Sequence, residues 1–193
     1  MSEISLFESN LLCPQVQSLL PVGYTLRALR SNDFERGFLD VLTVLTEVGG
    51  HTKQEFTGRY LSVHYVCCCL TLLFFAEQFN YLRKHNHEYH TITITEDAKD
   101  QVVAVGTIFV ERKFVHKNGL VGHIEDIAVN NNQQGKKLGL RIIQALKFIG
   151  AQRGCYKVIL DCSEKNVPFY EKCGFKQKEI EMAWYVPQDK ARL

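Results

Sequence analysis

A polar loop with two glycines could hold a phosphate group. Residues 134–139 read Gln-Gly-Lys-Lys-Leu-Gly and open a helical pattern. The first N–H groups of a helix lack partners within it, and the positive end of the helix dipole attracts anions. Gly135 and Gly139 would let backbone approach a ligand closely, and Lys136 and Lys137 would add positive charge. The alternative is an ordinary strand–helix turn whose basic residues are solvated.

Hydrophobic patterning predicts the elements that must position this loop. An apolar stretch over 121–129 predicts the strand before it, and apolar spacing over 138–153 predicts the helix after it. A polar hairpin turn is expected at 96–101. The element order β-α-α-β-β-β-α-β-α-β implies an α/β fold with one mixed sheet and helices on both faces. Further strands are predicted over 24–29, 89–95, 102–114, 156–162 and, as one or two strands, 176–186.

Two further helices are predicted before the second strand. Ser31 or Asn32 should cap the first, which should run to Gly49 and Gly50, and Thr52 should begin the second. Residues 1–20 are expected to fray.

Composition limits the function classes. The 193 residues suit one domain with a sizeable core, and a net charge of +2 gives no field for nucleic acid. An odd count of 7 cysteines without a signal peptide predicts reduced thiols and a cytoplasmic protein. The sequence has no paired CxxC spacing, and no acidic or cysteine set completes a site around the crowded His85, His87 and His90, so we expect no metal.

Two motifs together carry a resemblance to a known family. The loop at 134–139 is followed at 166–175 by Asn-x-x-Phe-Tyr-x-Lys-x-Gly-Phe, and both resemble the GNAT superfamily of N-acetyltransferases. Within it, the strings at 111–116, 122–129 and 154–162 are similar to the glucosamine 6-phosphate N-acetyltransferases, especially the fungal ones. The resemblance covers residues 24–58 and 77–186. It implies the GNAT fold, with a mostly antiparallel central sheet. One departure is Lys137, where the superfamily usually has glycine.

The resemblance implies transfer of acetyl from acetyl-CoA to the amine of D-glucosamine 6-phosphate, in a homodimer that makes N-acetyl-D-glucosamine 6-phosphate for UDP-N-acetylglucosamine. The loop would hold the diphosphate, and the strand edge at 127–130 would pair with the pantetheine arm. Tyr170 would protonate the leaving thiolate, because a phenol with a pKa of about 10 keeps its proton at neutral pH. The implied acetyl-CoA ligands are Ile127, Ala128, Val129, Gln134, Gly135, Lys136, Lys137, Leu138, Gly139, Asn166 and Tyr170. Asn166 could instead be a plain helix N-cap.

The resemblance also implies a sugar site. Glu125 and Asp126 are adjacent on a strand and should face opposite sides unless a bulge intervenes. The base stays open among a carboxylate, water and a backbone carbonyl, since an amine with a pKa of about 7.7–8.0 is largely neutral near pH 7.5. Catalytic candidates are Tyr170, Asp161 and Glu125; substrate candidates are Thr46, Lys113, His116, Glu125, Asp126, Tyr156 and Lys157. Tyr185 stands where some relatives carry an arginine, and the final strand with Trp184 is the candidate for exchange between subunits.

An apolar run over residues 60–76 has no amphipathic period and no counterpart that we recognise in the family. Deleting 58–76 would leave one continuous helical pattern. We favour a translated, unspliced intron, over a genuine buried helix extension and a membrane-touching hairpin; spanning a bilayer takes about 20 residues. The expected layout is an arm at 1–22, an acetyltransferase domain at 23–188 with this insertion at 58–76, and a tail at 189–193.

Two rival functions remain at this stage. A related acetyltransferase could act on a protein or polyamine amine, which an acidic groove would favour. Lys113, His116 and Lys157 instead favour an anionic substrate. The chain could also be a cofactor-binding module without catalysis. No nucleic acid or membrane partner is expected.

Overall fold

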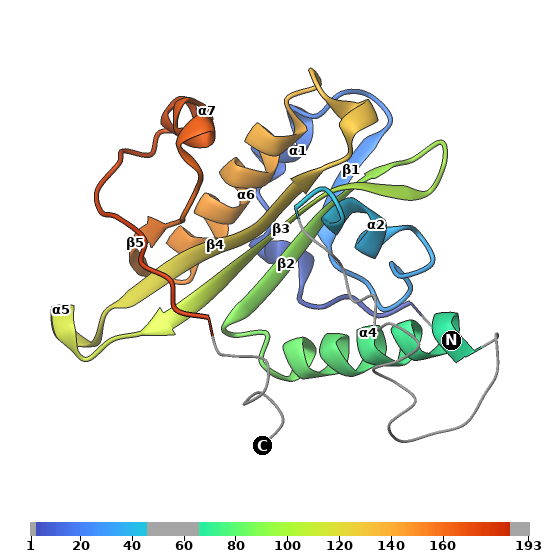
Figure 1. Ribbon diagram of the computed structural model, residues 1–193, viewed down its shortest axis with the longest axis horizontal. Helices are drawn as coiled ribbons and strands as arrows, with labels where there is room; N and C mark the ends of the chain where they lie inside the picture. Colours follow the sequence, from blue (N-terminus) through green and yellow to red (C-terminus); the bar gives the residue numbers. More distant parts are fainter. Residues whose placement is uncertain (1–2, 46–65, 186–193) are drawn as a thin grey trace. The chain divides into compact units, whose positions relative to one another are not determined.

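The computed structural model describes residues 3–45 and 66–185, with side chains left undescribed at 66–71. The chain forms two compact units, residues 1–160 and residues 161–193. Figure 1 shows the elements of both units.

The first unit is built on a five-stranded sheet in which sequence order equals spatial order. Neighbouring strands from β1 to β4 are antiparallel, while β5 is parallel to β4. This mixed, mostly antiparallel sheet confirms the predicted fold class. The strands are β1 (Tyr24–Ala28), β2 (Tyr89–Glu96), β3 (Gln101–Arg112), β4 (Leu120–Val129) and β5 (Cys155–Ile159).

Helices cover both faces of this sheet. Helix α6 (Leu138–Gln152) lies on one face, and the short α2 (Phe38–Leu42) lies on the other (Figure 1). The apolar stripe of α6 is buried, as its period predicted, and it packs directly on the β3 backbone: a Cβ at Gly106 would lie 2.4 Å from the Ile142 side chain. The glycine thereby fixes how closely α6 approaches the strands that lead to the loop at 134–139.

The predicted helix after β1 is wrong in its first part. Residues 31–37 form turns, and α2 begins only after Gly37, whose φ of 80° lies in the left-handed region. A helix capped by Ser31 or Asn32 would place Asp33 in its first turn, but the Asp33 carboxylate instead binds the Arg27 guanidinium and the Arg30 backbone N–H. The end predicted at Gly49–Gly50 and the next start at Thr52 lie outside the described residues.

The segment before β1 is packed, so the expected fraying is wrong for its described part. Leu6 and Phe7 are buried, and the Leu6 N–H donates to the Leu29 carbonyl at 2.8 Å. The Gln17 side chain binds the backbone of β1, where it accepts a hydrogen bond from the Leu26 N–H and donates one to the Tyr24 carbonyl. The short helices here are η1 (Ser9–Leu11) and α1 (Pro14–Ser18).

Helix α4 (Val66–Lys84) contains the described part of the unusual apolar run. Residues 66–76 continue into 77–84 without a break, which agrees with a helix extension. Phe75 and Phe79 are buried and stacked, whereas Leu73 and Phe74 are exposed. The intron hypothesis concerns the transcript and stays a prediction. No helix in the described ranges is both long and apolar enough to cross a bilayer.

His90 on β2 makes the first unit sensitive to acid. Burial, together with the nearby charge of Arg153, lowers the His90 pKa from 6.5 to about 4, and Arg153 donates to its Nε2 at 2.8 Å. Because the unfolded chain binds this proton more readily, stability falls as the pH drops from about 6.5 to 4. We expect a loss of about 2 kcal/mol between pH 7.5 and 5 from this group alone, measured by urea unfolding. In His90→Gln the loss over that interval should shrink by a similar amount; an unchanged loss would contradict the assignment.

The second unit contains η3 (Glu164–Asn166) and α7 (Val167–Lys172). The strands predicted over 176–186 are absent from residues 176–185, the described part of that range. A strand needs a neighbour to satisfy its backbone groups, and this segment has no pairing partner among the described residues. It leaves four large side chains exposed: Ile180, Met182, Trp184 and Tyr185.

Candidate active site

The predicted phosphate loop has the geometry of an open helix N-terminus. The turn η2 (Asn131–Gln133) leads into the loop, where Gly135 has φ of 81° and Lys137 has φ of 60°. Lys137 is the N-cap residue of α6, and neither a side-chain cap nor an acidic residue occupies its first turn. Backbone N–H groups at this end therefore remain available to an anion.

Lys137 adopts a left-handed conformation that suits glycine better, which explains why the superfamily usually has glycine there. Relieving the backbone strain at Lys137 should add about 1–2 kcal/mol to the free energy of unfolding. The greater flexibility of glycine in the unfolded chain should subtract about 0.5–1 kcal/mol. We therefore expect Lys137→Gly to raise the free energy of unfolding by about 0.5–1 kcal/mol. Urea unfolding would measure this, with Lys147→Gly inside α6 as a control that should lose about 1 kcal/mol. A destabilised Lys137→Gly would show that the lysine side chain outweighs the strain.

A β-bulge in β4 separates the two adjacent carboxylates. Thr107 pairs with Glu125 and Val105 with Ala128, so Asp126 and Ile127 both stand opposite Gly106. Asp126 has φ of 56°, and both carboxylate residues are exposed. Neighbouring atoms still desolvate the Asp126 carboxyl in part, which raises its pKa. The sequence left open whether a bulge interrupts this strand, and the structure has one. Glu125 and Asp126 therefore need not face opposite sides of the sheet as neighbours in a regular strand do.

The edge of β4 beyond the bulge is the predicted site for the pantetheine arm. Strand β5 pairs only with residues 120–123 of β4. At Ile127, Ala128 and Val129 the edge that would face β5 has no strand partner in the part of the chain that the structure describes. An extended ligand with amide groups could add to such an edge as a strand does. The loop at 134–139 follows this edge in the sequence after the short turn η2.

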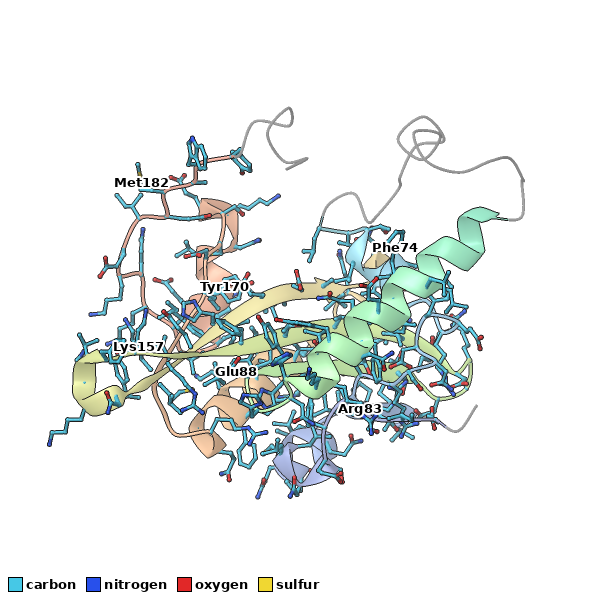
Figure 2. All side chains as sticks on the ribbon, turned by 90° about the horizontal axis from the view of Figure 1, so that it is seen from below. Phe74, Arg83, Glu88, Lys157, Tyr170 and Met182 are labelled. Carbon is cyan, nitrogen blue, oxygen red and sulfur yellow. The ribbon has the colours of Figure 1, made fainter. Side chains whose placement is uncertain are left out.

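Three of the predicted substrate residues gather where the β3–β4 connection meets β5. The His116 ring lies 4.4 Å from the Tyr156 ring, and Lys157 Nζ lies 5.9 Å from the centre of the same ring. Lys157 is labelled in Figure 2. Gly119 is required here, because a Cβ would lie 2.9 Å from the Tyr156 ring. The connection contains the single-turn α5 (Val115–Asn118), in which residues 116–118 have left-handed φ.

Lys113 is held by a carboxylate that sequence reasoning missed. Lys113 Nζ lies 2.6 Å from Glu111 Oε1, and His123 Nε2 lies 2.9 Å from Glu111 Oε2. Hydrogen bonds from Lys113 and then His123 lower the Glu111 pKa, so this carboxylate is ionised at neutral pH. Glu111 near the end of β3 and Lys113 just beyond it are two residues apart, a spacing that puts both side chains on one face of an extended chain, and that spacing was the available signal. The Glu111–His123 pair joins β3 to β4.

Three of the remaining candidates, Tyr170, Asn166 and Asp161, belong to the second unit. Partial burial, and then the charges that Cys162 and Cys173 carry when ionised, raise the Tyr170 pKa, which keeps the phenol protonated. The Tyr170 side chain is labelled in Figure 2. Asn166 is the N-cap residue of α7 but makes no side-chain cap hydrogen bond, and Asp161 is exposed. The meeting of Tyr170 with β4 and the loop stays a prediction, and Thr46 lies outside the described residues.

Comparisons with known proteins support one family. A family model described as "Acetyltransferase (GNAT) family" matches residues 59–175. Glucosamine 6-phosphate N-acetyltransferase 1 of Dictyostelium discoideum is 42% identical over 172 residues, which is 89% of this chain and 97% of that protein. The Candida albicans glucosamine 6-phosphate N-acetyltransferase is 43% identical, covering 85% of this chain and 97% of its own length. The crystal structure of the Arabidopsis thaliana enzyme of that name matches with a TM-score of 0.71 and 33% identity, over 85% of this chain and 99% of that one.

Proposed function

We propose, since this chain belongs to the GNAT acetyltransferase family, that it transfers the acetyl group of acetyl-CoA to the amine of D-glucosamine 6-phosphate. The products would be CoA and N-acetyl-D-glucosamine 6-phosphate, for UDP-N-acetylglucosamine synthesis in the cytoplasm. The observation that carries this proposal is the 42–43% identity with two relatives of that name over nearly their whole length. The Lys157 ammonium and the His116 ring beside Tyr156 agree with a phosphorylated acceptor.

The chemistry would be direct transfer between two bound substrates. The amine nitrogen attacks the thioester carbonyl, the carbon–sulfur bond breaks, and the thiolate takes a proton from the Tyr170 phenol. The N-terminus of α6 and residues 134–139 would bind the diphosphate, and backbone N–H groups of 127–129 would orient the arm and polarise the carbonyl. The amine must lose a proton, for which Glu125, Asp161, water and a backbone carbonyl remain the candidates. Asp126 would contact the sugar.

A second copy of the chain would complete the sugar site. Residues 176–185 are unpaired within their unit and carry four large exposed apolar or aromatic side chains. Such a segment could gain strand pairing from a partner. Thr46, Lys113, His116, Tyr156 and Lys157 would then hold the sugar and its phosphate. We therefore propose a homodimer, which sedimentation would test.

Thiol release from acetyl-CoA tests the proposed acceptor. Glucosamine 6-phosphate, glucosamine and a lysine peptide would be compared, with the full chain and with a version lacking residues 58–76. Turnover only with the phosphosugar supports the proposal. Turnover only with the peptide would replace it with an acetyltransferase for protein amines, and folded, dimeric protein without turnover would indicate a binding module. Activity restricted to the shortened chain would support the intron hypothesis.

A further inference from the structure

Gln133, the last residue of η2, is buried although it is polar, with only 3% of its surface exposed. It directly precedes the loop at 134–139, and neither its type nor its spacing singled it out in the sequence. A buried carboxamide is costly unless its donors and acceptors are used. Its partners therefore indicate what the residue does.

The Gln133 carboxamide joins the loop to two distant strand ends. Its Oε1 accepts from the Tyr24 hydroxyl at 2.8 Å, where β1 begins, and from Lys136 Nζ at 2.7 Å. Its Nε2 donates to Glu96 Oε2 at 3.3 Å, where β2 ends. Lys136 also donates to the Tyr24 hydroxyl, and its ammonium lies 5.0 Å from the centre of the Tyr24 ring.

Two features of this group bear on the loop. The hydrogen bond from Lys136 to Gln133 spans Gln134 and Gly135. It therefore holds both ends of the segment that leads into α6. The Lys136 ammonium, predicted to add charge at the phosphate, is instead directed at Tyr24 and Gln133. A loop already held in its binding shape loses less entropy when a ligand orders it.

We propose that Gln133 is the positioning residue of the diphosphate loop, holding residues 134–137 in their binding conformation through Lys136, Tyr24 and Glu96. This rests on the proposed function only in that the loop binds the CoA diphosphate. Gln133 itself does not touch substrate. Its loss should therefore weaken contacts to the diphosphate and leave contacts to the pantetheine arm in place.

Dissociation constants for CoA and for pantetheine, which lacks the diphosphate, would test this by NMR titration without any acceptor. In Gln133→Met we expect CoA to bind about tenfold more weakly, the effect of losing one such hydrogen-bond set, and pantetheine to bind within about twofold of the parent. In turnover assays, KM for acetyl-CoA should rise while kcat at saturation stays nearly unchanged.

A swapped pair separates positioning from folding. Gln133→Glu alone places a second carboxylate against Glu96 and should also weaken CoA binding. Gln133→Glu combined with Glu96→Gln restores the bond with its donor reversed, so CoA affinity should return. Gln17→Ala, which removes two hydrogen bonds to β1 but none to the loop, should lower stability and leave both affinities unchanged.

Three results would overturn the proposal: unchanged CoA affinity in folded Gln133→Met, equal weakening for both ligands, or no recovery in the swapped pair. A parent chain that binds CoA no better than pantetheine would refute the diphosphate site itself, and with it this inference. Failure to acetylate glucosamine 6-phosphate would refute only the proposed acceptor, because the binding measurements use none.

Discussion

Tyr170→Phe should lower kcat for acetyl transfer by about 10²–10⁴-fold, the usual contribution of a general acid. The ring remains, so its contacts with Phe169 and Phe175 should persist and KM for acetyl-CoA should change little. The leaving thiolate would then have to take its proton from water. Steady-state thiol release at saturating substrates measures the effect, with Tyr89→Phe, a half-buried tyrosine outside the proposed site, as the matched control.

The pH profile gives an independent reading of the same role. An acid works while it is protonated, so activity should fall only when the pH rises through the Tyr170 pKa. Partial burial, and then Cys162 and Cys173, raise that pKa above the usual tyrosine value of about 10. The alkaline fall assigned to Tyr170 should therefore lie above pH 10 and be lost in Tyr170→Phe. If the variant kept more than half of the parent kcat, another group would have to supply the proton.

The elements with a strong period were predictable from the sequence. Helix α6 was expected over 138–153 and covers Leu138–Gln152, because its apolar stripe has one large surface to bury. Strands β2 and β3 likewise lie within a residue or two of their predicted bounds. In each case the hydrophobic period of the segment matches the side chains that the sheet buries. The segment's own sequence is therefore enough to predict the element.

The errors fall where a distant partner decides the local structure. Asp33 looked like a first-turn helix residue, yet its carboxylate pairs with Arg27 on β1 and the chain forms turns. Residues 176–185 were expected to form one or two strands, but they have no strand neighbour in their unit. Pattern alone does not report whether such a partner exists.

The site was predictable in the same uneven way. The loop at 134–139 and the strand before it were found, because glycine spacing and a strand–helix boundary are local signals. Glu111 and Gln133 were missed, since His123, Tyr24 and Glu96 become their neighbours only through folding. The bulge in β4 could be predicted only as an alternative to a regular strand. Two adjacent carboxylate residues occur equally well in either.

Asp33→Ala should lower the free energy of unfolding by about 3–5 kcal/mol, the cost of breaking a buried ion pair. Two hydrogen bonds of 2.7 Å join this carboxylate to the Arg27 guanidinium, and the two side chains are 0% and 9% exposed. The substitution leaves the Arg27 charge buried without its partner, and it also removes the acceptor of the Arg30 N–H. Urea unfolding at pH 7 would measure the loss.

We attribute that loss in stability to the buried Arg27 charge that is left without its partner. A double substitution can separate this effect from the loss of the contact itself. Arg27→Met combined with Asp33→Leu removes both charges, so it should be distinctly more stable than Asp33→Ala. Arg30→Ala breaks only a part-exposed pair with Glu3 and should cost no more than about 1 kcal/mol. A loss below about 1 kcal/mol in Asp33→Ala would mean that water reaches Arg27 there. Because the pair ties β1 to the turns that precede α2, the loss should appear as global unfolding rather than as local fraying.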